Sequence, residues 1–329
     1  MSQLQETQQT WRSGFRLPAI ILMAAFVLFA PAFVGSYSLH AVVIAMIFLL
    51  PALGLNLLVG YTGLLSLAQG AFFGVGAYAS ALLSIHFNTP FYINVVSAGL
   101  ISGALALPLG IPALRLRATS FVMCTLGFIV IGQAISKNWI SLTRGDMGLS
   151  SVPKPYFALG PWSFSVVSTA AYYYLALAVA SLAILAFYLI VRSPAGRNMI
   201  AIRENETLAE AVGIPTWTYK LIVFVLSAVF AGVGGSLYVH YLTVVSPLTF
   251  QMYYTTTILI IVLGGGVGTI SGVVFGSILF VALSEVLRVA PEIRMIAYGI
   301  CLLLIVFKFP KGFAPVIDKV WLALGGQRA

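Results

Sequence analysis

About ten stretches of this 329-residue chain are apolar enough to lie in lipid, and they take up most of its length. A helix needs about 20 apolar residues to cross a bilayer. Such runs fall near residues 17–35, 39–59, 64–86, 92–113, 119–136, 170–191, 219–242, 253–268, 270–289 and 293–308. The eighth run is short and interrupted by glycine, so about nine to eleven spans are predicted.

The composition excludes an ordinary soluble domain. Hydrophobic residues make up 60% of the chain and charged residues only 8%, whereas soluble domains carry about 25% charged residues. In lipid, backbone groups have no water to bond, which leaves helices or a closed barrel. Barrel strands alternate over about ten residues, but these runs are continuously apolar. We predict an all-α, polytopic transmembrane helical bundle in one membrane domain.

The basic residues predict how the bundle is oriented. The net charge is +9, but these side chains sit at span ends rather than in one patch, so no nucleic-acid partner is predicted. With about ten spans and both termini cytoplasmic, most of them fall inside, as the positive-inside tendency requires. This assigns a cytoplasmic tail to 1–16, the permeation domain to 17–315 and a second cytoplasmic tail to 316–329. The run 17–35 resembles a secretory signal, but it is long enough to span and we expect it to be retained.

Two hydrophilic segments interrupt the apolar pattern. Residues 137–169 lie on the outer, periplasmic side in this orientation and are rich in glycine, proline, serine and aromatic residues. Aromatic side chains suit the membrane interface, where ring and polar tip are both satisfied. This loop could form a lid or a docking face for an external partner, or it could be an ordinary folded loop.

The second segment, 192–218, reads as a cytoplasmic loop that contains a helix. Helix-forming residues run from 197 to 212, with a modest apolar stripe on one side and several charges on the other. Gly213 takes the C-terminal cap position and Pro215 ends the helix. A short amphipathic helix of this kind fits a groove on a soluble partner. The alternative is a helix resting on lipid headgroups, which its three glutamates disfavour.

The remaining residues do not form any recognisable catalytic motif. The glycine run 264–268 lacks the lysine that a phosphate-binding loop requires, so the chain is not expected to hydrolyse a nucleotide. No catalytic triad or metal-ligand cluster is present in the sequence, and Cys124 and Cys301 lie in apolar spans. Ion-coupled carriers need intramembrane charges, which are almost missing here. The chain therefore predicts a channel, or a carrier powered by another subunit.

Glycines recur at four-residue spacing in three regions, 70–74, 99–103 and 264–276. In lipid, small residues let helices approach closely and so drive their association. A helix-packing role is therefore predicted for Gly70, Gly74, Gly264, Gly268, Gly272 and Gly276.

Three segments resemble a known family. The run GLNLLVGYTGLLSLAQGAFFGVGAYASALL (54–83) is similar to the hallmark segment of branched-chain amino-acid permeases of ABC importers. The runs GRNMIAIRENETLAEAVGI (196–214) and YKLIVFVLSAVFAGVGGSLY (219–238) resemble the cytoplasmic loop and next span of the larger, M-type permease subunit. The resemblance covers nearly the whole chain.

This resemblance implies partners and site residues. It implies a heterodimer with a second permease, two ATPase subunits that bind ATP and Mg²⁺, and a periplasmic binding protein; the chain itself binds no cofactor or metal. The segment that docks the ATPases would comprise Arg203, Glu204, Glu206, Ala209, Glu210, Ala211 and Gly213. The polar residues expected to border the translocation path are Asn56, Ser66 and Gln69. A helix-bracing role for these three is the alternative.

We therefore predict an inner-membrane permease subunit that imports branched-chain amino acids by alternating access. A urea or short-amide importer of the same architecture is the first alternative. A stand-alone passive channel and a membrane-anchored scaffold are the others, and neither needs a capped cytoplasmic helix.

Overall fold

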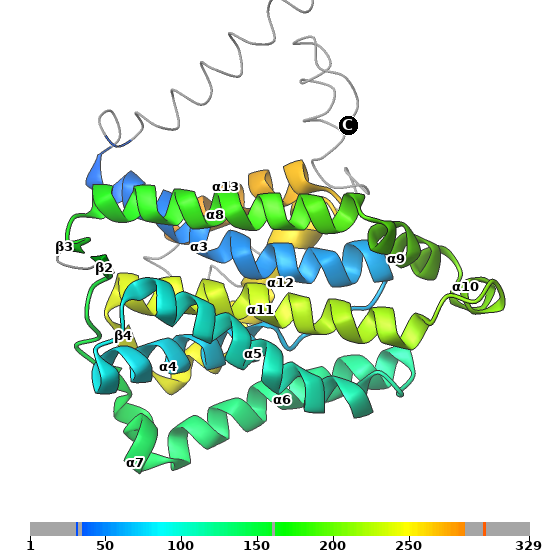
Figure 1. The fold of residues 1–329 in the computed structure, drawn as a ribbon, viewed down its shortest axis with the longest axis horizontal. Helices are drawn as coiled ribbons and strands as arrows, with labels where there is room; N and C mark the ends of the chain where they lie inside the picture. Colours follow the sequence, from blue (N-terminus) through cyan, green and yellow to red (C-terminus); the bar gives the residue numbers. More distant parts are fainter. Residues whose placement is uncertain (1–30, 32–34, 160–161, 287–298, 301–329) are drawn as a thin grey trace, which may run out of the picture.

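The computed structural model describes residues 31, 35–159, 162–286 and 299–300. Long helices lie side by side in this part of the chain (Figure 1). Six described helices are long and apolar enough to cross a membrane: α3 Ser36–Leu57, continued by a π-helical turn Leu58–Thr62, α4 Gln69–Phe87, α5 Phe91–Ala113, α6 Ala118–Asn138, α8 Thr169–Arg192 and α11 Thr216–Leu242. Two shorter apolar helices follow, α12 Met252–Gly265 and α13 Ile270–Val286.

The predicted all-α, polytopic membrane fold is confirmed. Each predicted span from 39–59 to 270–289 overlaps one of these helices. The predicted spans 17–35 and 293–308 lie outside the described residues, apart from residues 31, 35 and 299–300.

One predicted boundary is wrong, at the start of the span 64–86. Helix α4 begins only at Gln69, and the preceding residues form a non-helical connection. Gly63, with φ +72°, takes the chain out of the helix after the π-helical turn. Hydropathy could not show this break, because the connection is as apolar as the helices on either side.

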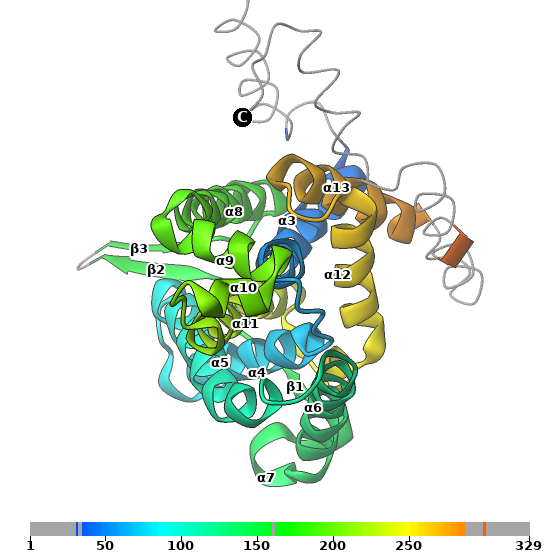
Figure 2. The same cartoon turned by 90° about the vertical axis from the view of Figure 1, so that its right-hand side faces the viewer.

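Helix α3 forms the centre of the bundle. It contacts α8, α11, α12 and α13, and Figure 2 shows these helices arranged around it when the bundle is viewed end on. Its apolar residues cover all sides of the helix, and Leu50 and Leu53 are completely buried. A helix that is hydrophobic all round belongs in the interior.

Helices α4 and α11 approach so closely that only glycine fits between them. A Cβ atom on Gly76 would lie 2.3 Å from the Gly232 carbonyl oxygen, and one on Gly235 would lie 2.0 Å from the Phe73 carbonyl oxygen. The small-residue packing of membrane helices therefore brings these two backbones together.

The loop after α6 is folded against the bundle. It contains the short helix α7 Ile140–Thr143, a 3₁₀ turn Gly145–Met147, and the strands β1 Leu149–Ser150, β2 Tyr156–Leu159 and β3 Trp162–Ser165. Strand β1 pairs antiparallel with β4 Val244–Val245, which follows α11, and β2 pairs antiparallel with β3. His240 of α11 lies with Nδ1 2.8 Å from the Pro153 carbonyl oxygen. These contacts hold the loop on the end of α11.

Candidate functional site

The hydrophilic segment after α8 forms two short helices at the end of the bundle opposite to β2 and β3 (Figure 1). They are α9 Pro194–Glu204 and α10 Glu206–Ala211. The prediction of one helix over 197–212 is wrong, because Asn205 is extended (φ −158°, ψ 105°) and separates them. Its side chain accepts a hydrogen bond from Leu208 N (3.0 Å) and so caps α10. Asparagine favours this role because its side chain competes with the helical backbone.

The C-terminal end of α10 has the geometry of a glycine cap. Gly213 has φ +89°, a conformation that glycine adopts without steric cost. The Gly213 amide bonds the Glu210 carbonyl oxygen (2.9 Å), and the Ile214 amide bonds the Ala209 carbonyl oxygen (3.0 Å). These bonds satisfy carbonyls that the helix end would otherwise leave free.

Two glutamates of α10 bind side chains of α11. Glu206 forms an ion pair with Lys220 of α11, and Glu210 accepts a hydrogen bond of 2.6 Å from the Thr216 hydroxyl. Both partners lie in the first two turns of α11. The carboxylates therefore hold α10 against the end of α11, a role that the sequence pattern did not reveal.

The apolar residues of this segment divide between the interior and the surface. Met199, Ile202 and Ala209 are buried, whereas Leu208 is 62% exposed and Val212 is 70% exposed. The latter two are four residues apart, as neighbours on a helix surface are. Of the predicted docking residues Ala209 alone is buried; the exposed ones are Arg203, Glu204, Glu206, Glu210, Ala211 and Gly213. The prediction missed Leu208 as an exposed apolar residue.

Arg203, near the end of α9, reaches the end of α3. Its Nη1 donates a hydrogen bond to the Gly60 carbonyl oxygen in the π-helical turn. Close by, Asn56 Oδ1 accepts from Gly268 N (2.8 Å) and Asn56 Nδ2 donates to the Thr269 carbonyl (3.3 Å). The α12–α13 turn is thus bonded to α3 beside the contact that Arg203 makes.

Ser66 and Gln69 lie in and after the non-helical connection between α3 and α4, and both are buried. Ser66 Oγ accepts a hydrogen bond from Ala68 N (3.2 Å). Gln69 Nε2 donates to Ser227 Oγ of α11, while its Oε1 has no hydrogen-bond partner among the described residues. Within that part of the chain, Asn56, Ser66 and Gln69 do not bond one another. Each bonds a different partner.

The glycines predicted to pack lie at several kinds of contact. Gly70 N bonds the Thr255 hydroxyl (3.0 Å), and Gly74 lies against the Phe250 ring. Gly264 is buried in α12. Gly272 and Gly276 lie against Gly265, so α12 and α13 approach through glycine. Gly268 instead has φ +80° and belongs to the turn between these helices.

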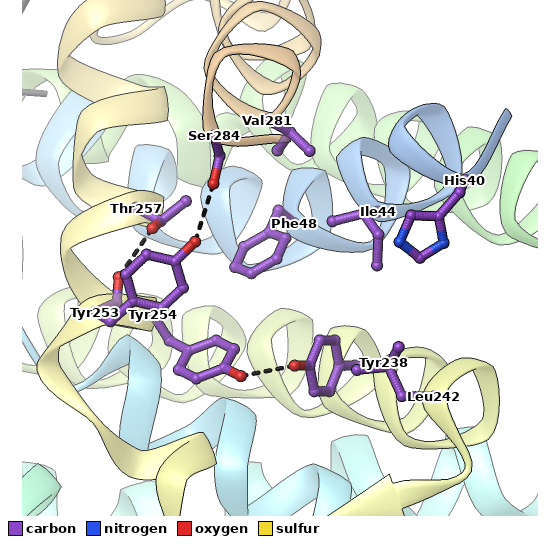
Figure 3. Close-up of a pocket in the computed structure, with 10 residues that line it drawn as sticks. All are labelled: His40, Ile44, Phe48, Tyr238, Leu242, Tyr253, Tyr254, Thr257, Val281 and Ser284. Atoms are coloured by element: carbon purple, nitrogen blue, oxygen red, sulfur yellow. Dashed lines mark hydrogen bonds between the residues drawn. The ribbon is translucent and has the colours of Figure 1, made fainter. Parts of the chain in front are cut away.

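A cavity of about 180 Å³ opens between α3, α11, α12 and α13. It is lined by His40, Ile44, Phe48, Tyr238, Leu242, Tyr253, Tyr254, Thr257, Val281 and Ser284. Figure 3 shows the Tyr238 and Tyr254 hydroxyls directed at each other (2.6 Å), and Tyr253 bonded to Ser284 (3.0 Å). The described lining carries no carboxylate, lysine or arginine. It therefore suits an uncharged, largely apolar group, and the sequence pattern gave no indication of it.

The part of the chain that the structure describes contains no group of three or more His, Cys, Asp or Glu side chains that could hold a metal ion. Its two ion pairs, Lys137–Asp146 and Lys220–Glu206, both lie at ends of long helices. Apart from Lys220, the buried polar side chains in the described part of the chain carry no formal charge. Gln69 Oε1 is among the buried polar atoms there that have no hydrogen-bond partner.

Residues 37–306 match the family model described as branched-chain amino acid transport system, permease component. The matched residues include every long helix described above, except for Ser36 at the start of α3.

Two relatives are high-affinity branched-chain amino acid transport system permease proteins LivM. The protein of Salmonella typhimurium is 33% identical over an alignment of 343 positions, which covers 95% of this chain and 81% of the relative. The Escherichia coli protein is also 33% identical, over 92% of this chain and 75% of the relative. A more distant relative is the permease protein LivH of Salmonella typhimurium, which is 27% identical over 85% of this chain and 96% of its own length.

Proposed function

The chain belongs to the family of branched-chain amino acid transport system permease components, and from this membership we propose how it works. It is a multi-pass inner-membrane permease subunit of an ABC importer for branched-chain amino acids. The protein is not itself the ATPase; hydrolysis of ATP with Mg²⁺ takes place on partner subunits.

The proposed assembly has two permeases. This chain resembles the M-type protein over nearly its whole length and the H-type protein more distantly, which supports a heterodimer of two related permeases. Two ATPases bind its cytoplasmic face and a periplasmic binding protein delivers the substrate. The membrane domain comprises residues 17–315 with about ten spans, and the tails 1–16 and 316–329 are both cytoplasmic.

The observation that carries the proposal is the arrangement of α10. Its carboxylates Glu206 and Glu210 hold it on α11, and this leaves the apolar side chains of Leu208 and Val212 exposed. Basic residues surround the segment in the sequence, which supports a cytoplasmic position for it. An exposed apolar pair on a firmly held helix fits a groove on a soluble partner. The docking surface consists of α10 with Arg203, Glu204, Val212 and Gly213.

The proposed path for the substrate passes the polar residues Asn56, Ser66 and Gln69. All three are buried between helices, and Gln69 Oε1 is left without a described partner. Neutral polar groups of this kind could pass a zwitterion without holding it tightly. A purely bracing role is the competing interpretation, and a variant of Asn56 described in the Discussion separates the two.

The test is a mild-detergent purification of the tagged chain from its native host, with the co-purifying proteins identified by mass spectrometry. A second permease and ATPases are expected to be recovered. Purified proteoliposomes supplied with binding protein and ATP should then accumulate leucine, isoleucine or valine. Accumulation of urea or a short amide instead would support the alternative importer. A well-folded chain recovered alone would contradict the proposal and favour a passive channel.

A further inference from the structure

The contact between Arg203 and Gly60 joins two segments that are 143 residues apart in sequence. Gly60 lies in the π-helical turn that ends α3, and the last carbonyls of a helix lack partners within it. The Leu64 amide, which follows the turn, bonds Leu58 rather than Gly60. The guanidinium of Arg203 therefore satisfies a carbonyl that the helix leaves free.

A third segment meets the first two at the same point. A Cβ atom on Gly60 would lie 2.6 Å from Gly268 N, so the two backbones touch. The Tyr61 hydroxyl donates to the Gly268 carbonyl oxygen (2.9 Å), and Asn56 Oδ1 accepts from Gly268 N (2.8 Å). Arg203 Nη1 lies 3.3 Å from the place that a Cβ on Gly268 would occupy. The ends of α9 and α3 and the α12–α13 turn thus form one junction.

The charge of Arg203 has no counter-ion in the part of the chain that the structure describes. No described carboxylate lies within 4 Å of it, because the ion pairs there are Lys137–Asp146 and Lys220–Glu206. A charged donor makes a stronger hydrogen bond to a carbonyl than a neutral donor does. This makes the junction a firm link between α9 and α3.

Arg203 is also placed where movement of the docking surface must reach it. Only Glu204 and Asn205 separate it from α10. Both short helices are attached to the long helices beside them. Ser193 caps α9 directly after α8. Helix α10 is bonded to α11 through Glu206 at its first residue and through Glu210 toward its far end. A displacement of α10 therefore pulls on Arg203, and through Arg203 on the end of the central helix.

We propose that Arg203 is a positioning residue that transmits movement of α9–α10 to the end of α3 and to the α12–α13 turn, and that it does not itself bind the ATPases. This inference rests on the function proposed above, and it removes Arg203 from the docking surface. Coupling between two sites requires an element that both sites bias, and the junction supplies that element.

The test uses the whole complex in proteoliposomes with the binding protein and substrate. Wild type is compared with Arg203→Ala, Arg203→Lys and, as a matched control, Arg197→Ala, another exposed arginine of α9. Three quantities are measured: ATPase subunits recovered per permease, ATP hydrolysis, and substrate transported per ATP. For Arg203→Ala we expect normal recovery of the ATPases, continued hydrolysis and a fall of about tenfold in transport per ATP. Arg203→Lys should recover part of the loss, and Arg197→Ala should behave as wild type.

Two results would overturn the inference. Loss of the ATPase subunits from Arg203→Ala would make Arg203 a docking residue, and unchanged transport per ATP would remove its coupling role. If Arg203→Ala fails to insert, Tyr61→Phe decides, because it removes only the bond to the Gly268 carbonyl and leaves Arg203 in place. We expect lower transport per ATP with intact assembly, and wild-type behaviour would contradict the junction. If the wild-type chain itself retains no ATPase, the proposed function fails instead.

Discussion

Glu206, the first residue of α10, forms an ion pair with Lys220, which lies in the second turn of α11. Lys220 is only 9% exposed, so its ammonium group depends on this carboxylate for a counter-charge. The pair fixes the position of the docking surface relative to the longest described helix. Its removal therefore has consequences for stability and for transport.

Replacing Glu206 with lysine should destabilise the permease, because two ammonium groups would then face each other. Since the carboxylate is half exposed, the expected loss is about 1 kcal/mol, which lowers the unfolding temperature by about 2 °C. Thermal unfolding of the purified chain in detergent measures this. The exchanged pair Glu206→Lys with Lys220→Glu should recover most of the loss. Equal unfolding temperatures for the single and exchanged variants would contradict the pairing.

The exposed side chain of Leu208 should contribute to binding of the ATPases. Leu208→Ser leaves the cap at Asn205 and the bonds of α10 unchanged, but removes apolar contact area. Truncating a side chain that contributes to an interface costs more than about 1 kcal/mol, so binding should weaken by about tenfold. The amount of ATPase that co-purifies with the tagged permease gives the readout. Leu142→Ser, an exposed leucine of α7 near the opposite end of the bundle, serves as control, and equal losses in both variants would argue against a specific docking role.

Asn56 offers a test between the path and the bracing interpretations. Asn56→Asp keeps the acceptor for Gly268 N and loses the donor to Thr269, whereas Asn56→Ala loses both bonds. A bracing role predicts lower unfolding temperatures, with a loss of about 1 kcal/mol per bond, and an equal effect on all substrates. A path role predicts an unchanged unfolding temperature and a raised KM for uptake. Parallel measurement of unfolding and uptake kinetics decides which one holds.

The glycine contact between α4 and α11 should tolerate no side chain. Gly235→Ala would place a methyl group 2.0 Å from the Phe73 carbonyl oxygen, so one helix would have to move. Overpacking typically costs about 1–3 kcal/mol of folding free energy. We therefore expect less folded protein on size-exclusion chromatography. Gly127→Ala in α6 is the control, because a Cβ there meets nothing within 4 Å. A monodisperse Gly235→Ala permease of normal yield would contradict this packing.

Much of the fold followed from local sequence. Spans such as 92–113 and 170–191 agree closely with α5 and α8, because an apolar run of this length has no other stable state in lipid. Gly213 stands at φ +89° after α10, where the position of glycine before a proline predicts a helix cap. Both features depend on residues close together in the chain.

Other features escaped sequence analysis for a common reason. Hydropathy joined residues 64–68 to a helix because it does not register that Gly63 adopts a positive φ. The helix predicted over 197–212 is two helices, because Asn205 has an extended backbone and its side chain bonds the Leu208 amide. In the docking segment the glutamates looked like an exposed charged face, yet Glu206 and Glu210 contact α11. Each case depends on a conformational choice that composition leaves open.

The sequence and the tertiary structure therefore decide different features of this protein, for physical reasons. Local apolar length and the cost of an unpaired backbone in lipid decide that the chain enters the membrane and which segments become helices. The partners of its few polar groups are decided only by packing. Asn56 bonds Gly268, which is 212 residues away in the sequence, and Arg203 bonds Gly60, which is 143 residues away. Such contacts form only after the helices have assembled, because glycine contacts set how closely those helices approach.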